Sequence, residues 1–204
     1  MQDLLTEVNA QRIDLPDADM VFWRDIQLGD PDRDWLNELT HSVPWHQDKI
    51  TLFGKPQLQP RLSAWYGDMA YRYSGLTLQP LPWTPVLCEL KQCIETLTAC
   101  RFNSVLLNYY RNQHDSMGMH SDDEKELGPQ PSIASLSLGE TRVLSLKHKI
   151  RRDLQTFKLP LPDKSLLLMR ADTQHYWRHG VAKSRRPCGP RINLTFRQIL
   201  EAPR

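Results

Sequence analysis

The stretch SIASLSLGETRVLSLKH, residues 132–148, contains two short runs rich in Ile, Val, Leu and Ser that are separated by a turn. Runs of this length and composition are typical of β-strands. Several short strands in succession, preceded by a helix, indicate two packed sheets. We therefore predict a mainly β protein with flanking helices, whose core is a two-sheet β-sandwich or a jelly roll (a double-stranded β-helix) with a helix packed on one sheet. The other predicted strands are residues 104–110, 155–161, 164–169, 175–182 and 191–197.

A helix and a turn-rich segment precede most of these strands. In TPVLCELKQCIETLTAC, residues 84–100, apolar residues recur at helical spacing, so one face of this helix is expected to pack on the core. A shorter helix is predicted within residues 32–40, with Asp32 or Asp34 as its cap. Gly and Pro recur between aromatic residues in 53–75, which favours hairpins or extended segments. The apolar residues of the longer helix are Val86, Leu87, Leu90, Ile94 and Leu97.

The composition is that of an ordinary globular protein. The 204 residues are 40% hydrophobic and 25% charged, which suits one domain with a core. The first twenty residues contain acids where a signal peptide has an apolar run, and no run approaches the roughly 18 apolar residues of a membrane span. We expect a cytoplasmic protein without a membrane partner. Cys88, Cys93, Cys100 and Cys188 form no C-x-x-C pair and are expected to be reduced thiols.

The overall charge does not by itself indicate nucleic acid as a partner. The formal net charge is only +2, so such a partner has to be argued from local patches. Two basic runs are present, KHKIRR at 147–152 and KSRR at 183–186. Each run either contacts phosphate or is a solvated surface, and both interpretations stay open.

The segment NYYRNQHDSMGMHSDDEKE, residues 108–126, groups histidines with acids. It is either a charged loop in water or a metal site beside a polar pocket. His120 and Asp122 are separated by one residue, so on an extended strand both side chains would point to the same face. His179, near the end of a later strand, is the best candidate for a third ligand. Two histidines and one carboxylate form the facial triad of non-haem Fe(II) oxygenases, which leaves coordination positions open.

The last predicted strand carries a second group of polar residues. In RINLTFR, the side chains of Arg191, Asn193, Thr195 and Arg197 alternate with apolar ones and share one face. Two arginines on a buried face are costly unless an anion meets them, and a dicarboxylate matches their bidentate geometry. The alternative is that this face is exposed to water. Further donors to the same ligand are predicted two residues apart in the strand at 104–110, at Asn108 and Tyr110.

The order N-x-Y, H-x-D-D-E, H and R-x-N-x-T-F-R resembles the AlkB family of Fe(II)- and 2-oxoglutarate-dependent nucleic-acid demethylases, and most closely its eukaryotic-type DNA repair branch. The resemblance runs from about Phe53 to Leu200 and includes QPRLSAWYGDMAYRYSGLTL, HSDDE and PRINLTFR. H-x-D alone is shared by many oxygenases, whereas its combination with R-x-N-x-T-F-R is specific. The resemblance implies Fe(II) as the metal, with 2-oxoglutarate and dioxygen as cosubstrates. It implies iron ligands at His120, Asp122 and His179, and 2-oxoglutarate contacts at Asn108, Tyr110, Arg191, Asn193, Thr195 and Arg197.

We also expect an organisation along the chain, of which the resemblance covers only the part from about Phe53 onward. Residues 1–50 are expected to form an N-terminal extension packed on the core, 51–101 the nucleotide-recognition hairpins with a supporting helix, and 102–204 the jelly-roll dioxygenase core, all within one structural domain. The chain departs from the family in the segment KIRRDL, residues 149–154. This segment is shorter than the basic loop of the duplex-gripping members, so the resemblance does not extend to a grip on the complementary strand.

A pocket for a flipped base is the next implication of the resemblance. Tyr73 corresponds to the ring that stacks on the base, with His120 on the opposite side, and Phe53 corresponds to a finger that fills the vacated stack. The alternatives are a half-buried strand face for the tyrosines and an ordinary core position for Phe53. An ion pair between an acid and an arginine is expected to fix the pocket wall. Tyr71 and Glu124 are predicted to contact the edge of the base, and Glu124 is also predicted to be catalytic. Asp123 and Arg61 are predicted to form the ion pair.

The expected function is oxidative demethylation of bases such as 1-methyladenine and 3-methylcytosine, with release of formaldehyde. The expected substrate is alkylated DNA, single- or double-stranded, with RNA as an alternative, and the protein is expected to act as a monomer, in the nucleoid of a bacterium or the nucleus of a eukaryote. One rival is a 2-oxoglutarate-dependent hydroxylase of a protein or a small molecule. A second rival is a β-sandwich that binds nucleic acid without turnover.

Overall fold

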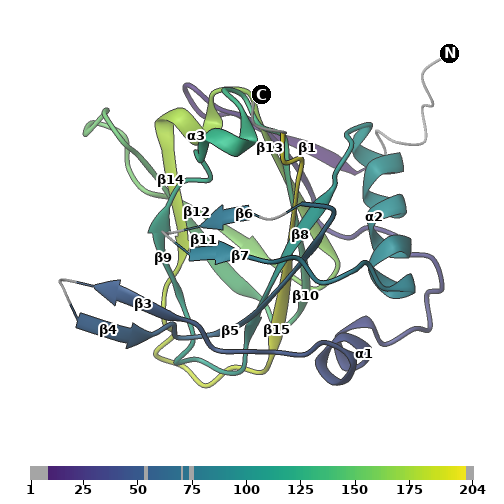
Figure 1. Cartoon of the computed structure of the whole chain (residues 1–204). Helices are drawn as coiled ribbons and strands as arrows, with labels where there is room; N and C mark the ends of the chain where they lie inside the picture. The colour runs from purple at the N-terminus through teal and green to yellow at the C-terminus, as the bar shows by residue number, and fades with distance from the viewer. Residues whose placement is uncertain (1–8, 53–54, 70, 74–75, 201–204) are drawn as a thin grey trace, which may run out of the picture.

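The computed structural model describes residues 9–52, 55–69, 71–73 and 76–200, in which two antiparallel sheets face each other (Figure 1). The large sheet has seven strands and the small sheet has four. In spatial order the large sheet contains β1 (Ala10–Ile13), β2 (Asp19–Trp23), β13 (Ser165–Arg170), β10 (Ile133–Gly139), β15 (Arg191–Arg197), β8 (Ser104–Tyr110) and β5 (Leu62–Gly67). The small sheet contains β12 (Phe157–Leu161), β11 (Arg142–His148), β14 (Trp177–Val181) and β9 (Met117–His120).

The strands from β8 to β15 form the predicted jelly roll. The chain crosses repeatedly between the sheets, so that β15 lies between β8 and β10 in the large sheet, and β14 lies between β9 and β11 in the small one. The two runs of residues 132–148 are β10 and β11, and they belong to different sheets. Their connection begins at Gly139, which has a φ of +87°; a Cβ there would lie 2.6 Å from the carbonyl oxygen of Pro190. This crossover places residues distant in sequence on facing strands.

Apolar side chains cover both faces of the large sheet. The outer face packs against α1 (Trp35–Ser42) and α2 (Pro85–Thr98), and the inner face packs against the small sheet (Figure 1). Helix α2 buries Leu87, Leu90 and Ile94 completely, as its apolar spacing predicts. Thr84 caps this helix by accepting a hydrogen bond from the backbone N–H of Leu87. The predicted helix and its packing on one sheet are therefore confirmed.

Two smaller hairpins lie beside the sheets. They are β3 (Lys49–Leu52) with β4 (Lys55–Leu58), and β6 (Tyr71–Tyr73) with β7 (Leu76–Leu78). Both fall in or next to the turn-rich segment for which hairpins are predicted. Between them, β5 joins the edge of the large sheet.

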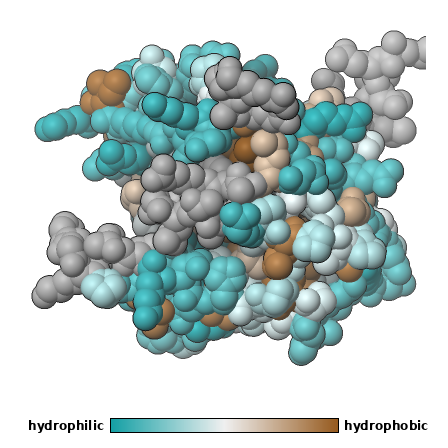
Figure 2. Space-filling model, in the orientation of Figure 1, coloured by the Kyte–Doolittle hydropathy of each residue, from teal (hydrophilic) through white to brown (hydrophobic). Residues whose placement is uncertain are grey.

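Some elements were not predicted from the sequence. Strands β1 and β2 extend the large sheet because β2 pairs with β13. A four-residue helix, α3 (Thr173–Tyr176), and a short 3-10 helix (Lys125–Leu127) lie near the acidic segment and the last histidine of the proposed triad. In the described ranges no helix is both long enough and apolar enough to cross a membrane. Figure 2 shows one face of the molecule, whose described surface is mainly hydrophilic.

Candidate metal and cosubstrate site

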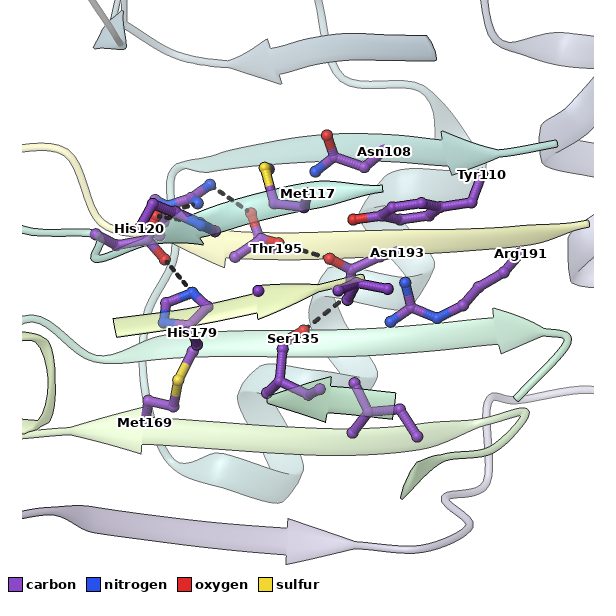
Figure 3. A pocket seen from close by; sticks show the side chains of 16 residues that line it. Asn108, Tyr110, Met117, His120, Ser135, Met169, His179, Arg191, Asn193 and Thr195 are labelled. Carbon is purple, nitrogen blue, oxygen red and sulfur yellow. Dashed lines mark hydrogen bonds and ion pairs between the residues drawn. The ribbon is translucent and has the colours of Figure 1, made fainter. Parts of the chain in front are cut away.

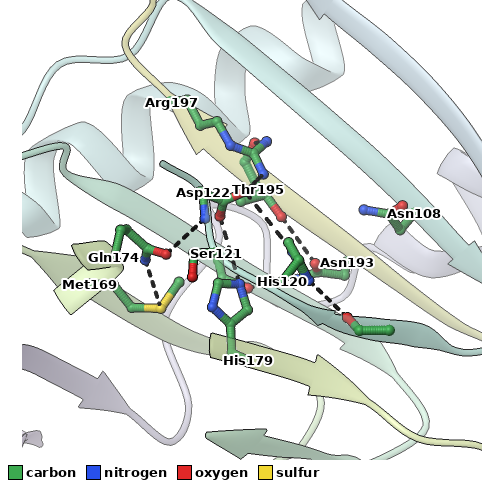
Figure 4. A network of polar contacts seen from close by, with 12 residues as sticks. Asn108, His120, Ser121, Asp122, Met169, Gln174, His179, Asn193, Thr195 and Arg197 are labelled. Carbon is green, nitrogen blue, oxygen red and sulfur yellow. Dashed lines mark hydrogen bonds and ion pairs between the residues drawn. The ribbon is translucent and has the colours of Figure 1, made fainter. Parts of the chain in front are cut away.

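His120, Asp122 and His179 converge at one end of the space between the sheets (Figure 4). Their ligand atoms all lie within 4.8 Å of one another. His120 is the last residue of β9 and is paired directly with His179 on β14. The spacing of the two residues suggested that Asp122 lies on the same strand as His120. Instead, Asp122 lies two residues beyond the end of β9, in a loop. The loop nevertheless brings its carboxylate to both histidines.

The nitrogen and oxygen atoms of the triad that could bind a metal face each other. Nδ1 of His120 lies 2.9 Å from the carbonyl oxygen of Gly118, and donation there leaves Nε2 with its lone pair. Nε2 of His120 is 4.0 Å from Oδ1 of Asp122, and Nε2 of His179 is 3.7 Å from Oδ2. Within the described part of the chain, Oδ2 of Asp122 has no hydrogen-bond partner. A divalent cation would satisfy this buried oxygen.

The electrostatics of the triad favour the forms that bind a metal. Burial raises the pKa of Asp122, but the guanidinium of Arg197 and the two histidines outweigh that effect and hold the pKa at about 2. Nη2 of Arg197 donates to Oδ1 of Asp122 at 2.7 Å. Burial lowers the pKa of His179 to about 3, with a further contribution from His120. At neutral pH the site therefore presents a carboxylate and a neutral imidazole, which are the ligating forms.

A pocket continues from the triad between the two sheets (Figure 3). The polar residues of β15 reach it from the large sheet, because their apolar neighbours on the strand face the helices instead. All six side chains predicted to hold a cosubstrate line this pocket together with the triad. They are Asn108, Tyr110, Arg191, Asn193, Thr195 and Arg197.

Arg191 lies at the end of the pocket away from the triad. Its side chain is only 1% exposed, and Nη2 donates to the hydroxyl of Ser137 at 2.9 Å. Neither Nε nor Nη1 has a hydrogen-bond partner within the described residues. The guanidinium lies 5.1 Å from the ring of Tyr110, and burial lowers its pKa. The face of β15 is therefore not exposed to water, and this cation lacks the anion that its burial calls for.

The middle of the pocket is built from a chain of hydrogen bonds. Asn193 donates to the hydroxyl of Ser135 at 2.8 Å and to the carbonyl of Leu136 at 2.9 Å. Thr195 donates to Oδ1 of Asn193 at 3.1 Å. On the neighbouring strand, Asn108 accepts a hydrogen bond from Nε of Arg61 at 2.7 Å. These contacts fix the amide groups before any ligand is present.

The structure corrects one predicted contact. Arg61 does not pair with Asp123; it contacts Asn108 and, at 3.4 Å, the carbonyl oxygen of Ser116. Asp123 is exposed and pairs with Nζ of Lys149 at 2.9 Å. The physical reason is that the loop after β9 buries Asp122 beside Arg197 and leaves Asp123 at the surface, next to Lys149. With Asp122 directed inward, Asp123 is directed outward.

The other residues predicted for the base pocket keep their roles as predictions. Glu124 is half-buried at the start of the 3-10 helix. Phe53 and the side chains of Tyr71 and Tyr73 lie outside the described part of the structure.

Several lining residues were not predicted. Ser135 is one that the sequence could have indicated, because Ser135 and Ser137 alternate with leucines in β10 and so share the inner face. The apolar lining has no such signal, since its residues look like ordinary core. The other unpredicted lining residues are Met117, Leu144, Leu161, Met169, Gly180 and Val181.

Comparison with known proteins agrees with this geometry. Residues 30–197 match the family model described as "2OG-Fe(II) oxygenase superfamily". The chain belongs to the 2OG-Fe(II) oxygenase superfamily. Members of this superfamily use Fe(II), 2-oxoglutarate and dioxygen. The triad fits a metal ion, and Arg191, whose Nε and Nη1 lack partners among the described residues, fits a dicarboxylate.

Sequence relatives confirm the resemblance to the AlkB family within this superfamily. The chain is 42% identical over 200 residues to the Bos taurus "Alpha-ketoglutarate-dependent dioxygenase alkB homolog 3", covering 94% of this chain and 65% of the relative. It is 42% identical over 160 residues to the Mus musculus "DNA oxidative demethylase ALKBH2", covering 74% of this chain and 67% of the relative. The chain thus spans about two thirds of these relatives' length. The solved structure of OsALKBH1 shares the fold, with a TM-score of 0.62 and 18% identity over 93% of this chain and 99% of that one.

Proposed function

We propose that this protein is an oxidative demethylase that removes methyl groups from ring nitrogens of nucleobases, such as 1-methyladenine and 3-methylcytosine, in DNA, with RNA as an alternative substrate. The observation that carries the proposal is one pocket with a His-Asp-His triad at one end and a buried, incompletely paired guanidinium at the other. The name of the ALKBH2 relative, a DNA oxidative demethylase, supplies the class of substrate.

The two arginines of β15 suggest how 2-oxoglutarate would lie. Arg197 already donates to the metal-site carboxylate of Asp122, whereas Arg191 has unsatisfied N–H groups at the far end. We assign Arg191 to the carboxylate of 2-oxoglutarate that lies away from the metal, and Arg197 to the end next to it. Asn193 and Thr195 lie between the arginines on the same face and would contact the middle of the molecule.

The residues of the pocket would hold the metal ion in its ligating environment and keep water away from the reaction. When bound, Fe(II) and 2-oxoglutarate activate dioxygen and supply the oxidation of the N-methyl carbon to a hydroxymethyl group, which leaves as formaldehyde. Asp122 holds its negative charge because Arg197 pairs with it, and His179 stays neutral because it is buried. Met117, Leu144, Leu161 and Val181 exclude water from the pocket.

A basic groove on the small sheet supports nucleic acid as the partner. The groove has a volume of about 560 Å³ and includes Lys147, Arg151, Arg152 and Arg178. Lys147 and Arg178 lie directly opposite each other on β11 and β14. Neither forms an ion pair with another described residue, and like charges in such positions repel. Phosphate groups would relieve this repulsion. Of the two basic runs, residues 147–152 are thus the better candidate for phosphate contact.

We further propose that the protein acts as a monomer in the compartment that holds the nucleic acid, the nucleoid or the nucleus. A monomer suffices because all the site residues of the triad and the cosubstrate pocket come from one chain.

The proposed function can be tested with purified protein, Fe(II) and 2-oxoglutarate. Oligonucleotides of DNA and RNA, single- and double-stranded, would carry 1-methyladenine or 3-methylcytosine, and nucleoside mass spectrometry would measure conversion to the unmodified base. The rival, a hydroxylase of proteins or small molecules, predicts no conversion in any of these substrates.

The groove has its own test. Lys147→Glu with Arg178→Glu should weaken binding of the oligonucleotide and reduce the salt dependence of binding, while the affinity for 2-oxoglutarate stays unchanged. Arg185→Glu with Arg186→Glu is the matched control, because it reverses the same number of exposed charges in the other basic run. Equal effects of the two double variants on binding would remove the groove from the proposal.

A further inference from the structure

Asp122 lies in a loop, so its backbone N–H has no partner from a β-sheet. The residue is fully buried, and a buried N–H without a partner is costly. The side chain of Gln174 supplies the partner: its Oε1 accepts a hydrogen bond from the N–H of Asp122 at 3.0 Å (Figure 4). Because a backbone N–H can only donate, the atom that faces it is the oxygen of the Gln174 amide.

The amide of Gln174 is held from its other end. Gln174 is 2% exposed, and its Nε2 lies 3.4 Å from the sulfur of Met169, to which it donates. Met169 is itself buried in the wall of the pocket. The side chain therefore bridges the wall of the pocket and the loop of the metal site, and neither end is in contact with solvent.

Both neighbours of Asp122 are tied to the same short segment, residues 174–177. Ser121 donates its hydroxyl to the carbonyl oxygen of Trp177 at 2.8 Å. Lys149 donates at 2.9 Å to Asp123 and at 2.8 Å to the carbonyl oxygen of Gln174. Three consecutive loop residues are thus attached to the segment that comprises the end of α3 and the start of β14.

This segment leads directly to His179. Gln174 lies in α3, and β14 starts at Trp177, two residues before His179. The hydrogen bond to Gln174 is the one that holds the backbone of Asp122 itself, and the contacts of Ser121 and Lys149 support it, whereas Arg197 binds the carboxylate group. Partners of this kind, outside the ligands themselves, typically change metal affinity by about 10- to 100-fold when they are removed.

We propose that Gln174 is a positioning residue of the metal site, which fixes the backbone of Asp122 so that its carboxylate and the two imidazoles share one divalent cation. Lys149, which also lines the basic groove, assists through its contacts with Asp123 and the backbone of Gln174. The inference rests on the metal site of the proposed function.

Co(II) binding tests the role of Gln174 without turnover. Full-length wild-type protein and variants would be titrated with Co(II), with 2-oxoglutarate and nucleic acid absent, and the visible absorption of the bound ion would report affinity and coordination. Gln174→Met keeps the length of the side chain and removes the amide acceptor. Gln130→Met is the matched control, because Gln130 also bonds to the α3 region, at 3.1 Å to Asp172, but not to the metal loop.

We expect Gln174→Met to weaken Co(II) binding by about 10-fold or more and to change the absorption spectrum, while Gln130→Met binds like wild type. Gln174→Asn provides a second variant if the methionine variant does not fold, since it stays polar but is one methylene too short to reach the N–H of Asp122. Wild-type affinity and spectrum in a folded Gln174 variant would overturn the proposal. Failure of wild-type protein to bind Co(II) would instead refute the metal site itself.

Discussion

Replacing Arg191 by methionine should separate its role in ligand binding from its role in stability. The guanidinium is buried, donates a hydrogen bond to Ser137, and lacks partners for Nε and Nη1 among the described residues. Keeping a desolvated cation without an anion costs several kcal/mol. In the absence of 2-oxoglutarate, Arg191→Met should therefore leave the free energy of unfolding within about 1 kcal/mol of wild type, or raise it. Truncation of most buried side chains has the opposite effect.

The effect on cosubstrate binding should be large. A carboxylate held by two charge-assisted hydrogen bonds of about 1.5 to 3 kcal/mol each gains about 3 to 6 kcal/mol from this arginine. Since about 1.4 kcal/mol corresponds to a tenfold change in Kd, Arg191→Met should weaken 2-oxoglutarate binding by at least about 100-fold. Calorimetric titration of 2-oxoglutarate into the Mn(II)-loaded protein measures this change, and urea unfolding of the ligand-free protein measures the stability.

Arg197→Met is the matched comparison on the same strand face. Arg197 is also buried, but it pairs with the fully buried Asp122. Its removal leaves that carboxylate without its main cation and should cost about 3 to 5 kcal/mol of stability. The account of the two arginines would be refuted if Arg191→Met lost several kcal/mol without ligand and still bound 2-oxoglutarate nearly as tightly as wild type.

Three further predictions concern the triad and the base pocket. Asp122→Ala should abolish demethylation, and it should lower stability because Arg197 loses its partner. The double variant Asp122→Ala with Arg197→Met should regain much of the stability but no activity; urea unfolding measures the first effect and product analysis the second. Stability of the metal-free protein should fall as the pH drops from about 6.5 toward 3, because the unfolded state protonates His179 in that range and the folded state does not; His179→Gln should reduce the slope by up to about 1.4 kcal/mol per pH unit. Phe53→Ala should reduce repair of duplex DNA, spare single strands and leave the melting temperature nearly unchanged, and a large loss of stability with an unchanged duplex to single-strand ratio would contradict this.

The inner face of β15 was predictable because the period of a strand is fixed. In the strand at residues 191–197, alternation alone places both arginines with Asn193 and Thr195 on one face, and the apolar residues predict burial of the other face. The side chain that pairs with each arginine was not predictable in this way. Asp122 reaches Arg197 only because the loop after β9 turns its carboxylate inward, and nothing in the spacing of the motif specifies that turn.

Contacts between elements far apart in sequence depend on the crossings of the jelly roll. The expected pair of Arg61 and Asp123 was wrong for this reason, since strand pairing brings Arg61 to Asn108. Strand β1 was missed because three of its four residues are exposed, so that it has no apolar pattern. Gln174 has no signal in the sequence at all, because a single glutamine acquires its role from the loop that packs on it.

The most direct test of the proposed function is the stoichiometry of one reaction. The purified protein would be given Fe(II), 2-oxoglutarate, dioxygen and a single-stranded oligonucleotide that contains 1-methyladenine, and adenine, formaldehyde and succinate would be counted together. We predict one formaldehyde and one succinate for each adenine formed, and none of the three products from Asp122→Ala. Consumption of 2-oxoglutarate at the same rate without the methylated oligonucleotide, with the methylated base left intact, would contradict the proposed function.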